Sequence, residues 1–298
     1  MAHTVLHPGR RQSAFTLIEL LVCIAIVALL LGLILPTLAA ARGAGHVSVC
    51  ASNLRQLQIA NLMYAQESRG GYAPGAPDFL SNLVRWHGSR ESASAAFTPG
   101  GGTLTEYISG GDAEGGGASG AVRACPGFSP PRDGFERSAG GYGYNNAFVG
   151  TVRGPVVGGM LVPPVAPPGP PGSELLVVVT DRVGSREDRF AAPNATVAFT
   201  DSALAAGSAS STAGGAIEYS FAEPRFWPDA AGARLDPSVH FRHGGKRDGR
   251  AGVVWLDGHV GSEARTFTWS SGLYGADPEP LRIGWFGAAD DNSLFDYE

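Results

Sequence analysis

Motifs of catalysis and of metal binding are absent from this chain of 298 residues. It contains no G-x-S-x-G, H-E-x-x-H or P-loop motif and no strand-linked G-x-G-x-x-G. Its 3 cysteines form neither a C-x-x-C pair nor a spacing typical of zinc sites. Charged residues make up only 16% of the chain, whereas hydrophobic residues make up 44%, a share that supports a folded core. The composition favours a folded protein, and no motif favours an enzyme.

Charge is also missing from one long stretch near the N-terminus, where residues 15–35 are uncharged except for Glu19. As a helix this stretch spans about 31 Å, close to the hydrocarbon core of a bilayer. No second apolar run of this length exists to pack on it, which disfavours a buried helix of a soluble domain. Arg10 and Arg11 precede it without any acid, which predicts a cytoplasmic N-terminus. The small residues in 38–42 leave open an ordinary secretory signal with a cleavage site there.

Glu19 argues for a more specific role of the apolar stretch. It follows Phe15 by one helical turn, and a carboxylate in a membrane helix is usually functional. The sequence AFTLIELLVCIAIVALLLGLILP resembles the class III signal of type IV pilins and type II secretion pseudopilins. The resemblance implies that a prepilin peptidase cuts between Ala14 and Phe15 and methylates the new amine. It also implies that Glu19 acts in subunit assembly and that Pro36 kinks the helix. The chain departs from the family at Ala14, where a glycine is usual.

The resemblance also implies a domain plan and a location. We expect a cleaved basic leader (1–14), a transmembrane helix (15–36), an amphipathic helical continuation (37–69) and a head outside the cytoplasmic membrane (70–298). The implied fold is α+β, with the long N-terminal helix packed on an antiparallel sheet and with long Gly/Pro-rich loops in the head. Without the leader, which holds 2 of the 22 basic residues, 20 basic residues face 27 acidic ones, a net charge of −7. This balance disfavours nucleic acid as a partner.

A second helical pattern follows the apolar stretch. Apolar or small residues recur at helical spacing at Cys50, Leu54, Leu57, Ala60 and Tyr64. This pattern predicts a helix with one buried face, on which Arg55, Gln56 and Gln58 point to solvent. The glycine pair at Gly70 predicts the end of the helix.

The cysteines are consistent with an exported head. Cys23 lies inside the apolar stretch and is interpreted as a small hydrophobic residue. Cys50 and Cys125 lie beyond it, in a compartment where disulfides form. Two interpretations stay open, a disulfide between Cys50 and Cys125 or two separate buried thiols.

Three strand candidates lie within residues 175–222 of the head. Leu175–Asp181 is rich in β-branched residues and predicts a buried strand. Residues 195–201 and 216–222 are weaker candidates. A Pro/Gly-rich loop precedes the first of the three.

A hairpin is predicted within residues 243–263. Val253–Leu256 and His259–Glu263 read as strands, and Asp257 and Gly258 between them predict a type I′ turn. The region resembles the C-terminal H-x9-DG element of a group of pilin-like proteins, with His243, Asp257 and Gly258 at the matching positions.

Other motifs of that group extend the resemblance over most of the chain. The group carries C-x-x-N-L-[RK]-Q, C-P and Y-G-x-N, which stand here at Cys50–Gln56, Cys125-Pro126 and Tyr142–Asn145. One departure is that thirteen residues, not nine, separate His243 from Asp257. We interpret residues 246–249 as an insertion that must loop out.

The same region offers acids and imidazoles for a metal. Asp248 and Asp257 are the candidate ligands of a Ca²⁺ site. The alternative, which we prefer, is that His243 caps a loop and that Asp257 only makes a turn, with no cofactor bound.

The sequence thus predicts a non-enzymatic, prepilin-like structural subunit of a pilus- or pseudopilus-type fibre or of a type II secretion-like system. Its expected partners are the prepilin peptidase, other pilin-like subunits and the cytoplasmic membrane. The alternative is a membrane-tethered binding module outside the cytoplasm that uses the pilin signal only for export.

Overall fold

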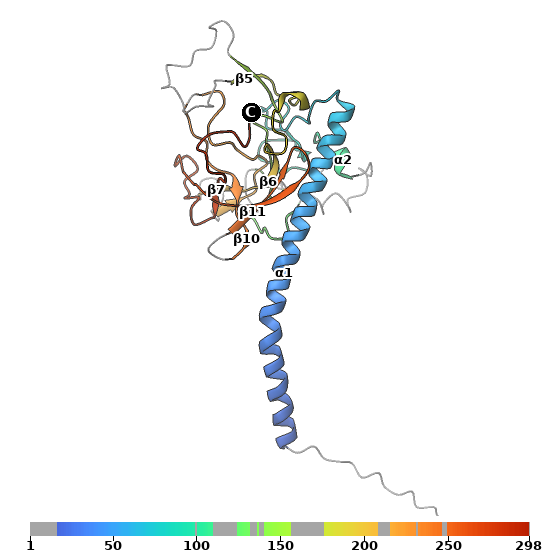
Figure 1. Cartoon of the computed structure of the whole chain (residues 1–298), viewed down its shortest axis with the longest axis vertical. Helices are drawn as coiled ribbons and strands as arrows, with labels where there is room; N and C mark the ends of the chain where they lie inside the picture. Colours follow the sequence, from blue (N-terminus) through green and yellow to red (C-terminus); the bar gives the residue numbers. More distant parts are fainter. Residues whose placement is uncertain are drawn as a thin grey trace, which may run out of the picture. The chain divides into compact units, whose positions relative to one another are not determined.

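The structure is a computed structural model, and it divides the chain into two units, residues 1–44 and 45–298. The residues it describes are 17–98, 100–109, 124–131, 136, 140–155, 176–207, 215–230, 232–245 and 249–297. Figure 1 shows the longest element, helix α1 (Leu17–Glu67), which begins in the first unit and ends in the second. The expected cleavage point, Ala14 and Phe15, lies outside the described residues.

The described part of the first unit consists of α1 up to Ala44. The described side chains of this part are exposed, including Leu17 at 78% and Leu29 at 66%. By length and composition, α1 can cross a membrane. Pro36 lies inside the helix, and the next residue, Thr37, donates from Oγ1 to the carbonyl of Ile34 over 2.8 Å.

In the second unit, α1 buries one face. Leu54 and Leu57 are fully buried, whereas Tyr64 is only partly buried. The prediction that Gln58 faces solvent is wrong, because its side chain is fully buried and donates from Nε2 to the carbonyl of Leu256 over 2.7 Å. The helix ends at Glu67, shortly before Arg69 and Gly70, whose φ angles of 56° and 83° are left-handed.

The packing partner of α1 is an antiparallel five-stranded sheet, so the predicted α+β class is confirmed. Its strands are β3 (Tyr142–Tyr144), β6 (Val197–Asp201), β10 (His243–Gly244), β11 (Gly249–Trp255) and β12 (Val260–Ala264). β11 pairs with β12 along one edge. Along its other edge it pairs with β10 at its start and with β6 at its end, and β3 continues the sheet beyond β6. Every residue of β6 is buried, as expected for an interior strand.

Short elements surround this sheet. Four two-stranded antiparallel ladders are described: β1 (Val84–Arg85) with β2 (Gly88–Ser89), β4 (Val152–Pro155) with β5 (Leu176–Thr180), β7 (Leu204–Ala206) with β8 (Gly215–Ile217), and β9 (Val239–His240) with β13 (Ile283–Gly284). The remaining elements are helix α2 (Thr105–Ser109) and the 3₁₀ helix η1 (Glu187–Arg189).

The strand predicted at Leu175–Asp181 exists as β5, but its predicted burial is wrong. Val178 and Val179 are 45% and 65% exposed. Among the described strands, β5 pairs with β4 alone, outside the five-stranded sheet. A run of β-branched residues therefore favours a strand here without specifying what covers it.

The predicted hairpin between β11 and β12 is present, but the type I′ turn is wrong. Gly258 has a φ of 89°, whereas Asp257 is not among the residues with positive φ. The Gly258 N–H donates to the carbonyl of Trp255 over 2.9 Å, and the Trp255 N–H donates to the carbonyl of His259 over 3.1 Å. This is a three-residue loop with glycine in the left-handed position. The loop begins at Leu256, whose side chain is buried in the core.

The Tyr142–Asn145 motif has a packing explanation. A Cβ atom on Gly143 would lie 2.4 Å from the carbonyl oxygen of Phe221, so only glycine fits there. Asn145 is fully buried, and its Nδ2 donates to the carbonyls of Val197 and Phe295 over 2.9 and 2.7 Å. The motif therefore ties β3 to β6 and to the C-terminal segment.

Candidate functional site

A disulfide joins α1 to the head. Cys50 and Cys125 are bonded, with 5.5 Å between their Cα atoms and a sequence separation of 75. Both are buried, and Cys50 is the first buried residue of α1 among those whose burial is described. Of the two interpretations left open by the sequence, the structure contains the disulfide.

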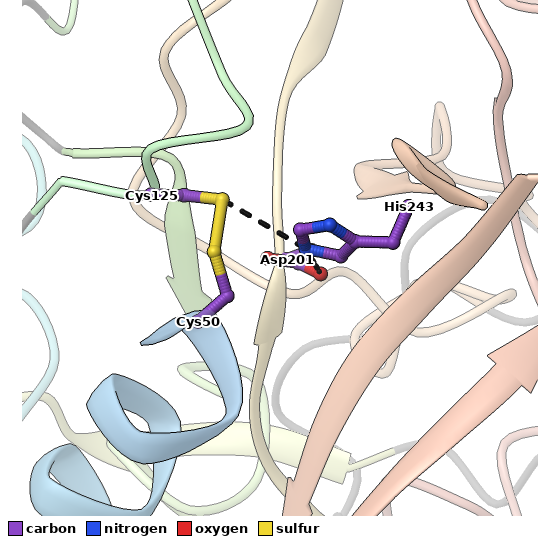
Figure 2. Close-up of side chains that lie close together, drawn as sticks. All are labelled: Cys50, Cys125, Asp201 and His243. Carbon is purple, nitrogen blue, oxygen red and sulfur yellow. Dashed lines mark hydrogen bonds and ion pairs between the residues drawn. A yellow bond between two sulfur atoms is a disulfide. The ribbon is translucent and has the colours of Figure 1, made fainter. Parts of the chain in front are cut away.

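A carboxylate and an imidazole lie beside this disulfide. Figure 2 shows one nitrogen of the His243 ring directed toward both Cys125 and Asp201, with the disulfide on that side of the ring. Nε2 of His243 lies 3.0 Å from Oδ2 of Asp201 and 3.8 Å from Sγ of Cys125. Asp201 is fully buried and ends β6, while His243 begins β10. The sheet thus brings together two side chains that are 42 positions apart.

Further groups stabilise the buried carboxylate of Asp201. The Gly252 N–H on β11 donates to its Oδ2 over 2.6 Å. On the other side, Nε of Arg242 lies 3.9 Å from its Oδ1. Burial lowers the pKa of the Arg242 guanidinium, and the neighbouring carboxylate of Asp201 opposes that shift. An ionised carboxylate needs such partners when water is excluded.

Two polar residues of β3 and α1 extend this cluster. The Tyr142 hydroxyl accepts a hydrogen bond from Nδ2 of Asn53 over 3.0 Å. Burial raises the pKa of the Tyr142 phenol above its ordinary value. The Asn of the C-x-x-N-L-[RK]-Q motif is therefore a buried donor, which explains a polar residue beside Leu54 on the buried face.

His243 and the Asp257-Gly258 turn have different partners among the described contacts. The carboxylate partner of His243 is Asp201, whereas Oδ1 of Asp257 accepts the His259 N–H over 3.1 Å and lies 2.6 Å from Nδ1 of His259. Of the predicted insertion at residues 246–249, residues 246–248 lie outside the described residues, and Gly249 begins β11, where it pairs with Gly244 of β10. Asp248, one of the two candidate calcium ligands, is among residues 246–248, so that site stays a prediction.

Sequence reasoning missed Asp201 as a site residue. Its only local sign was its position at the end of the strand candidate at residues 195–201, where a carboxylate follows a run of mostly apolar and β-branched residues. Its partner His243 comes from a strand that the sequence did not predict. The pairing of β6 with β11 is needed to bring the two together.

A separate cavity of about 330 Å³ lies in the head, next to β4 and β5. Its wall is mainly apolar and includes the rings of Phe79, Phe221 and Trp227. Arg153 and Asp229 form an ion pair in the wall. Burial raises the pKa of Glu223, a third charged group there, to about 7. An apolar cavity with a few charged groups is the usual form of a small-molecule site.

At the other end of the described chain, Glu19 lies in the first turn of α1. A carboxylate in the first turn complements the positive end of the helix dipole. The helix that follows is uncharged from Leu20 to Leu35.

Comparison with known proteins identifies this N-terminal segment. Residues 9–35 match the family model described as the prokaryotic N-terminal methylation motif. Neither a curated protein nor a solved structure matches the chain. The match indicates a prepilin-type signal, and hence processing by prepilin peptidase and anchoring by the apolar helix. It covers a small part of the chain and does not extend to the head.

Proposed function

We propose that the protein is a prepilin-like structural subunit of a pilus- or pseudopilus-type fibre or of a type II secretion-like system. The observation that carries the proposal is the methylation motif at residues 9–35. It coincides with an apolar helix whose described side chains are exposed up to Ala44. A helix with so much exposed apolar surface needs either lipid or neighbouring helices around it. Polymerised pilin-like subunits supply the neighbouring helices.

Glu19 has a role in this proposal. Cleavage after Ala14 places a positive amine on Phe15, one helical turn from the carboxylate. When subunit helices bundle, the amine is surrounded by apolar side chains, and an unpaired buried charge costs several kcal/mol. Pairing with Glu19 of an adjacent subunit removes that cost and sets the stagger between helices.

The first test is the position of cleavage. The full chain is expressed with a prepilin peptidase, and the membrane form is analysed by intact mass and N-terminal sequencing. We expect a chain that starts at Phe15 and carries a methyl group, and we expect the uncut chain when the peptidase is omitted. A chain that starts within residues 38–42 would identify an ordinary secretory signal and overturn the proposal.

The second test is fibre assembly in a host with the complete machinery. We expect Glu19→Ala to be cleaved and inserted in the membrane but absent from sheared fibres. Glu91→Ala, which removes an exposed carboxylate from the head, is the matched control and should leave the fibre yield unchanged. Equal fibre yields from Glu19→Ala and the parent would contradict the assembly role of Glu19.

The cavity in the head favours a second candidate, a membrane-tethered binding module that uses the prepilin signal for export. A packing subunit has no need of an apolar cavity of about 330 Å³ with charged groups in its wall. The two candidate functions differ in whether the chain assembles: a fibre subunit enters fibres, whereas a tethered module stays in the membrane. A processed chain that never enters fibres in a competent host would favour the tethered module.

A further inference from the structure

Four side chains with different donor atoms converge at the disulfide. The potential ligand atoms of Cys50, Cys125, Asp201 and His243 all lie within 4.8 Å of one another, and all four residues are buried. Two sulfurs, one imidazole nitrogen and one carboxylate oxygen form a donor set that Zn²⁺ accepts. Bonds of about 2.0–2.3 Å in a tetrahedral site place ligand atoms about 3.3–3.8 Å apart. The widest pair must therefore contract by roughly 1 Å, and the two sulfurs must move apart after reduction to about 3.8 Å, before the four atoms surround an ion.

We propose that this cluster has two chemical states, a disulfide when it is oxidised and a site for one Zn²⁺ when it is reduced. A phosphine reductant and one water convert the Cys50–Cys125 bond into two thiols, and the phosphine becomes its oxide. Zn²⁺ then replaces the two thiol protons, which pass to solvent. The imidazole of His243 and the carboxylate of Asp201 complete the tetrahedron. This inference goes beyond the proposed role in a fibre and does not depend on it.

The oxygen of Asp201 that faces the imidazole of His243 is Oδ2, which lies 3.0 Å from its Nε2 and accepts the Gly252 N–H over 2.6 Å. The buried Oδ1 has no hydrogen-bond partner among the described residues and lies 3.9 Å from Nε of Arg242. A buried carboxylate is costly unless it is paired, and a metal ion is one partner that lowers this cost. The Gly252 N–H holds the carboxylate in place, as outer partners of metal ligands usually do.

Charge balance supports the same assignment. In the disulfide state, the ionised carboxylate of Asp201 faces the guanidinium of Arg242, 3.9 Å away. In the zinc state, two thiolates and one carboxylate carry three negative charges, which Zn²⁺ and the guanidinium of Arg242 balance. The buried cluster is therefore neutral in both states, so that neither state leaves an uncompensated charge in the interior.

The test uses the full chain in detergent, in a Cys23→Ser background so that Cys50 and Cys125 are its only thiols. One sample is kept oxidised and one is treated with a phosphine, and both are titrated with Zn²⁺ and with Co²⁺. We expect one ion per chain in the reduced sample and none in the oxidised sample. With Co²⁺ we expect the thiolate charge-transfer band and the intense visible band of a tetrahedral site.

Variants identify the ligands. We expect Asp201→Asn and His243→Gln each to weaken Zn²⁺ binding to the reduced protein at least tenfold, because each removes one donor. His259→Gln changes the half-exposed imidazole beside Asp257 and should leave binding unchanged. Near-UV circular dichroism reports whether each variant is folded. If one of the two ligand variants is unfolded, the other carries the test.

Three results would overturn the proposal. The first is equal Zn²⁺ binding by the oxidised and reduced samples, and the second is binding that persists in both ligand variants. The third is a reduced protein that neither binds one ion nor regains its near-UV spectrum when Zn²⁺ is added. The comparison of oxidised with reduced parent protein needs no substitution of the four ligands, so a folding defect in a variant cannot obscure it.

Discussion

The two parts of α1 differ in what surrounds them. From Leu17 to Val49 the described side chains are exposed, although most of them are apolar. From Cys50 to Glu67 a face of the helix is buried, although that face includes the polar residues Asn53, Gln58 and Asn61. The more hydrophobic part of this helix is therefore the exposed part, and the buried face lies in the less hydrophobic part.

This difference shows that burial depends on the available partner. The described side chains of the first part are exposed, so its apolar surface requires lipid or other chains. The second part lies on the sheet, where polar side chains find specific acceptors such as the carbonyl of Leu256 for Gln58. A buried amide with a hydrogen bond is tolerated in a core, whereas an unpaired one is not. The predictions below compare matched substitutions at exposed and buried positions.

The largest expected effect is at the boundary between the two parts, where Cys50 is bonded to Cys125. We expect the Cys50→Ala/Cys125→Ala variant to lose about 4 kcal/mol of unfolding free energy, because the disulfide closes a long loop in the unfolded chain. The measurement is denaturant unfolding in detergent, followed by tryptophan fluorescence. All 5 tryptophans follow α1, so this fluorescence reports on the head.

Cys23→Ala is the control for the cysteine variant and should leave the unfolding curve unchanged, because Cys23 is exposed and unpaired. Thiol labelling of the denatured parent without a reductant should modify one cysteine per chain. Labelling of three cysteines without a reductant would show that Cys50 and Cys125 are free in solution.

A matched pair of leucines tests the comparison directly. Leu54 is fully buried and Leu30 is 52% exposed in the same helix. We expect Leu54→Ala to cost about 2–5 kcal/mol of head stability, because it removes apolar contacts and leaves a cavity. Leu30→Ala should change it by less than about 0.5 kcal/mol. The same unfolding assay measures both, and equal losses would contradict the assigned difference between the two parts.

A matched pair of glutamine variants tests whether the buried polar residues of α1 contribute to the stability of the head. Gln58→Ala leaves the buried carbonyl of Leu256 without its donor, which we expect to cost about 1–3 kcal/mol. Gln56 is exposed, and its Nε2 donates to Oγ of Ser52 on the surface of the helix, so Gln56→Ala should be close to neutral. If both variants were neutral, water would be replacing the amide of Gln58 in the core.

The α+β class was implied by the resemblance to pilin-like proteins, whereas local patterns predicted the helix and the hairpin of β11 and β12. They also predicted the strand β6, within residues 195–201. Each of these local predictions depends on residues close together in sequence, through helical spacing, β-branched runs or a turn glycine.

The rest depends on contacts between distant residues. Gln58 is buried because Leu256, 198 positions away, offers a carbonyl. Asp201 and His243 meet because β6 and β10 pair with the same edge of β11. The turn type was mispredicted because burial of Leu256 fixes where the loop begins. No local pattern in one sequence contains such pairings.

The smallest expected effect concerns β5, where a strand was predicted correctly and its burial was not. Valine and threonine have similar shapes and similar preferences for strands, so Val→Thr changes mainly the polarity of a position. Val179 is 65% exposed in β5, and we expect Val179→Thr to change the unfolding free energy by less than about 0.5 kcal/mol. Val253 is fully buried in β11, where the new hydroxyl lacks solvent, and Val253→Thr should cost about 1–3 kcal/mol. Denaturant midpoints of the two variants compare the sites directly. A loss in Val179→Thr as large as that in Val253→Thr would mean that β5 is covered in solution, by another part of the chain or by a second protein.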